Sequence, residues 1–274
     1  MNVGFIKNNL INIMKKIIVF VAILGLFLNF GGAFAKPVDN EFRIPSNALE
    51  VAPNVFSLGQ AYDKQSNLFV EGYAIVHKKE KAKNGSAKLP RPSACYVFLA
   101  TGAKWKNVEN WTVFPGAGLS GNFVLGNTAN NIAKWEAASG VPDILGSGSL
   151  GIGSPSDPKV SDDKNEISFG NLDANTIAVT IIWGNFGGPT FNRRLTAWDQ
   201  IYNTDFDWSE NATGSTTEMD FENISTHELG HSMGMDDVYN SACADVTMYG
   251  SGTEGEIQKR DLAPADILGI STLY

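Results

Sequence analysis

Residues 227–237 read His227-Glu228-Leu229-Gly230-His231-Ser232-Met233-Gly234-Met235-Asp236-Asp237. On a helix, His227 and His231 lie one turn apart on the same face, so both imidazoles can reach one metal ion while Glu228 stands beside it. Gly234 marks where such a helix ends and the chain turns back. The turn brings Asp237 round as a third ligand. The segment therefore predicts a zinc site with one open position and with Glu228 as its general base.

Histidine is rare in this chain, which makes the pairing informative. Only three histidines occur in 274 residues, and two of them are His227 and His231. The third, His77, ends an alternating, strand-like run that starts at Gly72 and precedes a basic stretch. We expect His77 to be a surface histidine without a ligand role.

Three other acidic residues compete with Asp237 for the third ligand position. Asp236 precedes it directly, and Glu254 and Glu256 lie in a later, glycine-flanked turn. Asp237 has the best spacing, ten residues after His227. We expect Asp237 to be the ligand, with Asp236 as the alternative.

Zinc held by three protein ligands keeps its fourth position for water, lowers the pKa of that water and polarises a substrate carbonyl. Glu228 would take the water proton and pass it to the leaving amine, so peptide hydrolysis is the reaction that fits best. With Asp237 in place of a neutral imidazole, zinc and its ligands carry less positive charge, and the water is less acidified. We therefore expect an alkaline pH optimum.

Residues 1–35 have the pattern of a secretory signal. Two lysines precede an apolar run, and Ala33-Phe34-Ala35 forms a small-residue cleavage site. The apolar run is shorter than the roughly 20 residues of a typical membrane span. We expect cleavage after Ala35, with Met14 as an alternative start, and a secreted or extracytoplasmic protein that is not held in the membrane.

Removal of this signal takes three of the 21 basic residues and none of the 29 acidic ones, which leaves a net charge near −11. A basic stripe and an arginine-aromatic pattern are both missing from the sequence, which argues against nucleic acid and anionic membranes as partners. We expect a monomer that acts on protein or peptide substrates.

Two cysteines, Cys95 and Cys243, predict one disulfide in an exported chain. It would tie the start of the main domain to the loop after the metal helix. A second interpretation makes Cys95, which follows Leu89-Pro90-Arg91-Pro92, a latency thiol that caps the zinc until the front segment is removed. That interpretation leaves Cys243 unpaired outside the cell, so the disulfide is favoured.

After the signal, the chain divides into a front segment, 36–92, and a main domain, 93–274. The front segment is strand-like in places and ends in a lysine-rich linker from Lys78 to Ser86. Such a linker is a natural site for proteolysis, which makes 36–92 a candidate propeptide.

Within the main domain, Thr176 to Trp183 is predicted to be a strand, and Val124 to Ala138 a helix that ends at Gly140. Asp220 is placed to cap the metal helix, and Pro264 to open a terminal one. A long loop is predicted from Gly146 to Asn165. Three of its acids are candidate ligands for calcium: Asp157, Asp162 and Asp163.

Three segments near the C-terminus resemble the matrixins, a branch of the metzincin metalloproteases. Thr226 to Asp236 resembles their active-site helix, Val246-Thr247-Met248-Tyr249 their Met-turn, and Asp266 to Tyr274 their closing helix. The resemblance implies an α+β fold, in which a twisted mixed sheet carries an active-site helix, a Met-turn and a C-terminal helix. Met248 would form an apolar floor beneath the zinc. The implied activity is that of a secreted zinc-dependent endopeptidase.

The chain departs from the matrixins at the third ligand, where they have histidine and this chain has Asp237, as some bacterial and archaeal metzincin-like proteins do. It also lacks the histidines of the matrixins' second, structural zinc, so we expect a single zinc. The resemblance implies a peptide substrate bound beside an edge strand, for which Ile177 to Trp183 is the candidate. Tyr239 and Tyr249 are candidates for steadying the oxyanion, although a structural role is favoured for each.

A different class of function remains as an alternative. A domain of the same fold can keep its zinc and lose turnover, acting as a binding or adhesion module. Intact Glu228 favours the enzyme, because only catalysis needs a carboxylate at that position.

Overall fold

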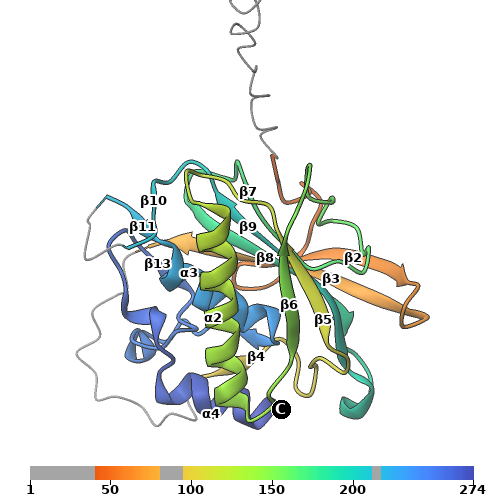
Figure 1. Ribbon diagram of the computed structural model, residues 1–274. Helices are drawn as coiled ribbons and strands as arrows, with labels where there is room; N and C mark the ends of the chain where they lie inside the picture. Colours follow the sequence, from red (N-terminus) through yellow and green to blue (C-terminus); the bar gives the residue numbers. More distant parts are fainter. Residues whose placement is uncertain (1–40, 81–94, 212–216) are drawn as a thin grey trace, which may run out of the picture. The chain divides into compact units, whose positions relative to one another are not determined.

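A mixed β-sheet is the framework of the protein, and its helices pack against one face of that sheet (Figure 1). The computed structural model describes residues 41–80, 95–211 and 217–274. The expected signal sequence and most of the lysine-rich linker lie outside these residues. Among the described residues, no helix is long and apolar enough to cross a membrane.

In the described part of the chain, nine strands form one sheet. Eight of them lie in the order β1-β2-β3-β8-β9-β7-β5-β6, and β13 pairs with β3. Their bounds are β1 Glu50–Ala52, β2 Val55–Asp63, β3 Leu68–Lys79, β5 Glu109–Val113, β6 Leu145–Leu150, β7 Glu166–Gly170, β8 Thr176–Asn185, β9 Arg194–Asn203 and β13 Ser251–Gly252. The strands from β9 to β6 run parallel, whereas β8, β3, β2 and β1 alternate in direction. The predicted mixed sheet is therefore confirmed.

Strand β8 lies inside the sheet, which corrects the expectation that Ile177 to Trp183 forms an edge. It is hydrogen-bonded to β9 on one side and to β3 on the other. Nine of its ten residues are buried. A continuous run of β-branched and apolar residues is what a strand covered on both faces requires. The edge expectation was wrong because the partner, β3, comes from the front segment.

The front segment supplies three strands of this sheet. β3 pairs with β8 from Glu71 opposite Gly184 to Lys78 opposite Thr176, and β2 pairs with the far side of β3. Val70, Ala74 and Val76 are fully or almost fully buried in a second apolar cluster with residues of β8 and β9. The division that the sequence suggests near residue 92 thus separates strands of a single sheet.

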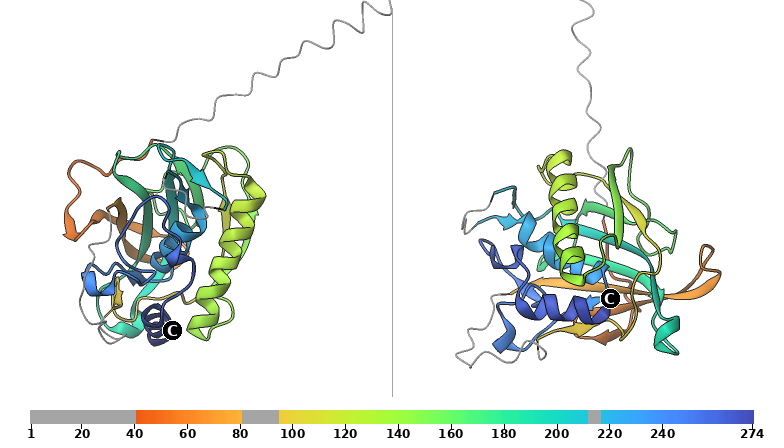
Figure 2. Two further views of the ribbon diagram at one scale, coloured as in Figure 1. Left: turned by 90° about the vertical axis from the view of Figure 1, so that its left-hand side faces the viewer. Right: turned by 60° about the horizontal axis from the view of Figure 1, so that its bottom comes forward.

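Three α-helices appear among the described residues: α2 Gly121–Ser139, α3 Phe221–Ser232 and α4 Pro264–Leu273. The predicted end of α2 at Gly140 and the predicted Asp220 cap of α3, which accepts the Asn223 N–H at 2.8 Å, are confirmed, and α4 begins at Pro264 as expected. α2 lies beside both α3 and α4 (Figure 2). The main core fills the space between these helices and the sheet.

The predicted loop from Gly146 to Asn165 begins as a strand. β6 runs parallel to β5 through Leu150, and Gly148 leaves room for the Trp111 ring of β5. This glycine therefore serves packing within a strand, although the composition of the segment predicts a loop.

Short elements connect these parts. β4 (Val97–Phe98) pairs with β12 (Met235–Asp236), and β10 (Trp208–Ser209) with β11 (Met219–Asp220). Single 3₁₀ turns lie at η2 (Thr190–Asn192), η3 (Ser241–Cys243) and η4 (Gln258–Arg260).

The Cys95–Cys243 disulfide is confirmed. Its two Cα atoms are 5.5 Å apart, and both cysteines are buried. The disulfide joins Cys95, two residues before β4, to Cys243 in η3. The turn η3 follows the loop that carries Asp237. The latency-thiol interpretation of Cys95 is wrong, because its sulfur is bonded to Cys243.

Candidate metal centre

Helix α3 presents both histidines to the interior, and the chain turns back directly after it. Gly234 adopts φ 101°, a conformation that favours glycine, and a Cβ there would lie 2.8 Å from the Ala103 carbonyl oxygen. The turn leads into β12 and returns Asp237 to the helix. The predicted helix end and reversal are therefore present.

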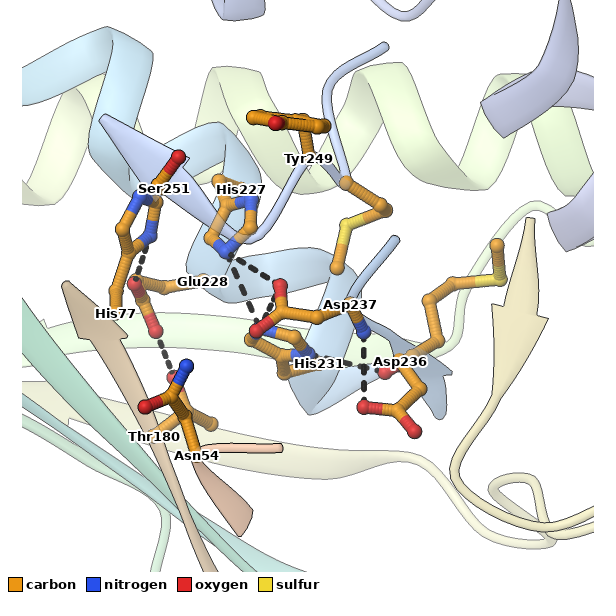
Figure 3. A network of polar contacts seen from close by, with 12 residues as sticks. Asn54, His77, Thr180, His227, Glu228, His231, Asp236, Asp237, Tyr249 and Ser251 are labelled. Atoms are coloured by element: carbon orange, nitrogen blue, oxygen red, sulfur yellow. Dashed lines mark hydrogen bonds and ion pairs between the residues drawn. The ribbon is translucent and has the colours of Figure 1, made fainter. Parts of the chain in front are cut away.

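Three ligand atoms meet at this point (Figure 3). The Nε2 atoms of His227 and His231 are 3.2 Å apart, and Asp237 Oδ1 lies 3.3 and 3.4 Å from them. A tetrahedral zinc with bonds of about 2.0–2.1 Å has ligand atoms about 3.3–3.4 Å apart. The three atoms form a triangle that fits one face of that tetrahedron.

The hydrogen bonds around the histidines leave their lone pairs facing the centre of the triangle. His227 Nδ1 donates to the Thr247 carbonyl at 2.7 Å, and His231 Nδ1 to the Met235 carbonyl at 3.0 Å. Because a carbonyl only accepts, Nδ1 carries the hydrogen in each ring and Nε2 is free to bind a metal. Asp237 Oδ1 is buried and has no hydrogen-bond partner among the described residues. Two lone pairs and a carboxylate at this distance repel one another unless a cation lies between them.

The electrostatics of the metal-free groups agree with this need for positive charge. Burial lowers the pKa of His227 to about 3. Burial also opposes protonation of His231, but the Asp237 carboxylate outweighs it and raises the pKa of His231 to about 9. Without a metal, a proton on His231 balances Asp237. The donor set therefore fits a divalent cation such as zinc, which can replace that proton.

The other candidates for the third ligand lie outside the triangle. Two groups of close metal-binding atoms occur among the described residues, one from His227, His231 and Asp237 and one from His77, His227 and Glu228. Asp236 Oδ1 accepts the backbone N–H of Asp237 at 2.8 Å and belongs to neither group. Glu254 pairs with Lys79, and Glu256 is also outside both groups. The structure therefore brings Asp237 to the two histidines, whereas Asp236, Glu254 and Glu256 lie apart from them.

Met248 lies beneath the helix, as the resemblance implies. It is fully buried, and a Cβ on Gly230 would lie 2.2 Å from the Met248 sulfur. The turn is held from α4, where the Asp266 carboxylate accepts the N–H groups of Thr247 and Met248 at 2.8 and 3.2 Å. This role of Asp266 was not predicted from the sequence, although an acid in the first turn of a helix is a recognisable signal.

Glu228 points into the same region and is fully buried. Its Oε2 accepts a hydrogen bond from Thr180 Oγ1 of β8, and its Oε1 lies 3.0 Å from His77 Nδ1. Burial raises the pKa of Glu228, with the nearby histidines opposing that rise. A carboxylate with a raised pKa holds a transferred proton more readily than an ordinary one, which suits a general base that must later return that proton.

His77 is a buried residue of this site, and the expectation of a surface histidine was wrong. Its exposed fraction is 0 %, and its ring lies 3.9 Å from that of His227, centroid to centroid. β8 and β13 flank the end of β3, and the side chains of His227 and Glu228 from α3 lie against the ring. Because side chains alternate along a strand, His77 lies on the same face as the buried Ile75. This alternation is visible in the sequence, but the basic residues after His77 led to the expectation of a surface position.

Two further residues support the site. The Tyr239 hydroxyl donates a hydrogen bond to Asp237 Oδ2 at 2.9 Å, so Tyr239 contacts the predicted third ligand. Lys259 is buried, and its Nζ donates to the carbonyls of Tyr249 and Ser251 at 2.6 and 2.7 Å. Burial lowers the pKa of Lys259 to about 8. Lys259 thus fixes the segment after Met248, and Tyr249 contributes its carbonyl to that contact.

The acids proposed for calcium do not gather into a cluster. Asp157 pairs with Lys159 at 3.2 Å, and Asp162 with Lys164 at 3.4 Å. Asp163 lies against Asp63. None of the three acids of this loop belongs to a group of close metal-binding atoms within the described ranges.

Residues 163–274 match the family model for matrixin, a span from just before β7 to the last residue of the chain. No curated protein matches the chain. The matched span includes α3, the Met248 turn and α4, and it excludes β1 to β3 and α2.

Proposed function

Because residues 163–274 match the family model for matrixin, we propose that this chain is a matrixin-like metzincin and a secreted zinc-dependent endopeptidase. The triangle of His227 Nε2, His231 Nε2 and Asp237 Oδ1 beside the Glu228 carboxylate carries this proposal. A hydrolase of this type needs both a metal held by protein ligands and a separate base. Here the ligands and the base come from one helix and its return loop.

The proposed roles follow from the position of each group. His227, His231 and Asp237 would hold the zinc, which when bound polarises a substrate carbonyl and lowers the pKa of water. Glu228 accepts the proton of the attacking water and gives it to the leaving amine. The burial that raises the pKa of Glu228 suits it to both halves of this transfer.

Secretion is supported by the disulfide. Disulfides persist in oxidising compartments outside the cytosol, and the Cys95–Cys243 bond is well buried. Together with the signal pattern of residues 1–35, this supports an extracytoplasmic protein. We propose that it acts as a monomer on protein or peptide substrates.

We also propose that the front strands stay with the mature enzyme even if the chain is cut in the lysine-rich linker. Loss of β2 and β3 would expose the apolar side of β8 and the buried residues Val70, Ala74 and Val76. Burial of a valine side chain such as that of Val70 or Val76 is worth about 1.5–3 kcal/mol. Intact mass measurement of the purified, mature protein tests this: a chain, nicked or not, that still contains residues 50–79 agrees with it, and their absence contradicts it.

Hydrolysis of casein tests the proposed function. We expect zinc-loaded wild-type protein to degrade casein and the Glu228→Gln variant, which keeps the size of the side chain, to be at least about 100-fold slower. The variant should retain its zinc, because Glu228 is not a ligand. Equal rates in both proteins would point to a contaminating protease, and the absence of hydrolysis in both would favour the zinc-containing binding domain.

A further inference from the structure

We propose that His77 is a positioning residue for Glu228, holding the Oε1 atom of the base through the hydrogen on its Nδ1. The inference rests on the proposed peptidase function and adds to it a residue of β3. His77 lies 150 positions upstream of His227 in the numbering and outside the matrixin match at 163–274.

The contact itself is short and buried. His77 Nδ1 lies 3.0 Å from Glu228 Oε1, and both side chains are fully buried. The ionised carboxylate that a base requires can only accept, so the nitrogen is the donor. Thr180 Oγ1 donates to the other oxygen, Oε2. Because each carboxylate oxygen accepts one hydrogen bond, both the plane of the carboxylate and its position are fixed (Figure 3).

The sheet supplies both donors at a fixed spacing. His77 is paired with Ala178 across the β3–β8 ladder, and Thr180 is paired with Ile75. His77 and Thr180 are therefore diagonal neighbours on the same face of the sheet, the face toward α3. A shift of one residue in the pairing would turn His77 to the opposite face. The long ladder between β3 and β8 prevents such a shift.

The His77 ring is confined on its remaining sides. It packs against the His227 ring with 3.9 Å between centroids and 62° between planes. On the β13 side, a Cβ on Gly252 would lie 3.2 Å from His77 Nε2. The ring is thus a spacer between the base and a proposed metal ligand. Removing it would leave Glu228 Oε1 without its donor and with room to rotate.

Three variants separate positioning from simple support of the fold. His77→Ala removes the donor, and His77→Asn offers an amide N–H close to the position of Nδ1. Val76→Ala is the matched control, because Val76 is the preceding residue of β3 and equally buried but faces the second apolar cluster. Each protein is assayed on a fluorogenic peptide that the wild type cleaves, with zinc content and unfolding temperature measured beside kcat and KM.

We expect His77→Ala to keep one zinc and to lose about 10- to 100-fold in kcat with KM changed by no more than about twofold, as misplacement of a catalytic group predicts. His77→Asn should recover most of that loss. Val76→Ala should lower the unfolding temperature and leave kcat unchanged. An unchanged kcat in His77→Ala, or an asparagine variant no better than the alanine one, would overturn the proposal. A higher kcat in His77→Ala would show that β3 blocks the site instead.

A readout independent of activity covers the case in which the peptidase function fails. In zinc-loaded protein labelled with ¹⁵N-histidine, His77 should carry its hydrogen on Nδ1, and its resonance should move in Glu228→Ala. A hydrogen found only on Nε2, or a resonance that ignores the loss of Glu228, would contradict the contact. Wild type and Glu228→Ala that are equally inactive would refute the peptidase function, and the resonance would still decide the contact.

Discussion

The hydroxyl of Tyr239 lies 2.9 Å from Oδ2 of Asp237, while Oδ1 of the same carboxylate faces the two histidines. Burial and then the charge of Asp237 raise the pKa of Tyr239, so its hydroxyl remains a donor. Asn54 of the front segment donates to the same hydroxyl at 2.9 Å. The front strands therefore reach the proposed third ligand as well as the proposed base.

Removal of the Tyr239 hydroxyl should weaken zinc binding. A hydrogen bond that orients a metal ligand is typically worth about 10- to 100-fold in metal affinity. We expect Tyr239→Phe to bind zinc about 10-fold more weakly, measured by competition with a chelator of known affinity. Tyr62→Phe is the control, because Tyr62 is half exposed on β2 and bonds only to Asn67 on the same hairpin. Equal zinc affinity in Tyr239→Phe and wild type would show that Asp237 needs no such support.

A methyl group at Gly230 should disturb the floor of the site. The added Cβ would lie 2.2 Å from the Met248 sulfur and 2.9 Å from the Trp135 ring. We expect Gly230→Ala to lose about 1–3 kcal/mol of unfolding free energy in urea, as overpacking of a core does. Gly126→Ala, in α2, is the matched control: a Cβ there meets nothing within 4 Å, and alanine favours the helix, so stability should rise by up to about 1 kcal/mol. Two variants of equal stability would contradict this packing.

The pair of Asp63 and Asp163 should make stability depend on pH. Burial, and then the hydrogen bond to Asp63, raises the pKa of Asp163 from 3.8 to about 6. The folded protein thus binds this proton more tightly than the unfolded chain, and stability falls as pH rises from about 4 to about 6. We expect Asp163→Asn to unfold at a higher temperature than wild type above pH 6 and at nearly the same temperature below pH 4. A difference that is constant across this range would rule out the shifted proton.

The parts of the site that were predicted from sequence are local in the chain. The spacing of His227 and His231 on a helix, the reversal at Gly234 and the return of Asp237 need no knowledge of distant segments. The parts that were missed depend on pairing between distant segments. His77 enters the site only because β3 pairs with β8, and the same pairing turns the expected edge strand into an interior one.

Predictions that rested on composition were wrong where the role of a residue depends on its partners in the fold. The glycine- and serine-rich residues of β6 were predicted to be a loop, although they form a strand in which Gly148 leaves room for the Trp111 ring. Lys259 and Asp266 are charged residues that composition places at the surface, but both are buried and hold backbone groups around Met248. Buried charges of this kind are visible only once their partners are placed.

Zinc content per chain tests the central claim most directly. Purified wild-type protein dialysed against metal-free buffer should retain one zinc per chain by elemental mass spectrometry. His231→Ala, which removes one corner of the triangle, should retain almost none, and Asp237→Ala should retain less than wild type after the same dialysis. Wild type with far less than one zinc per chain, or His231→Ala with as much zinc as wild type, would contradict the metal centre described here.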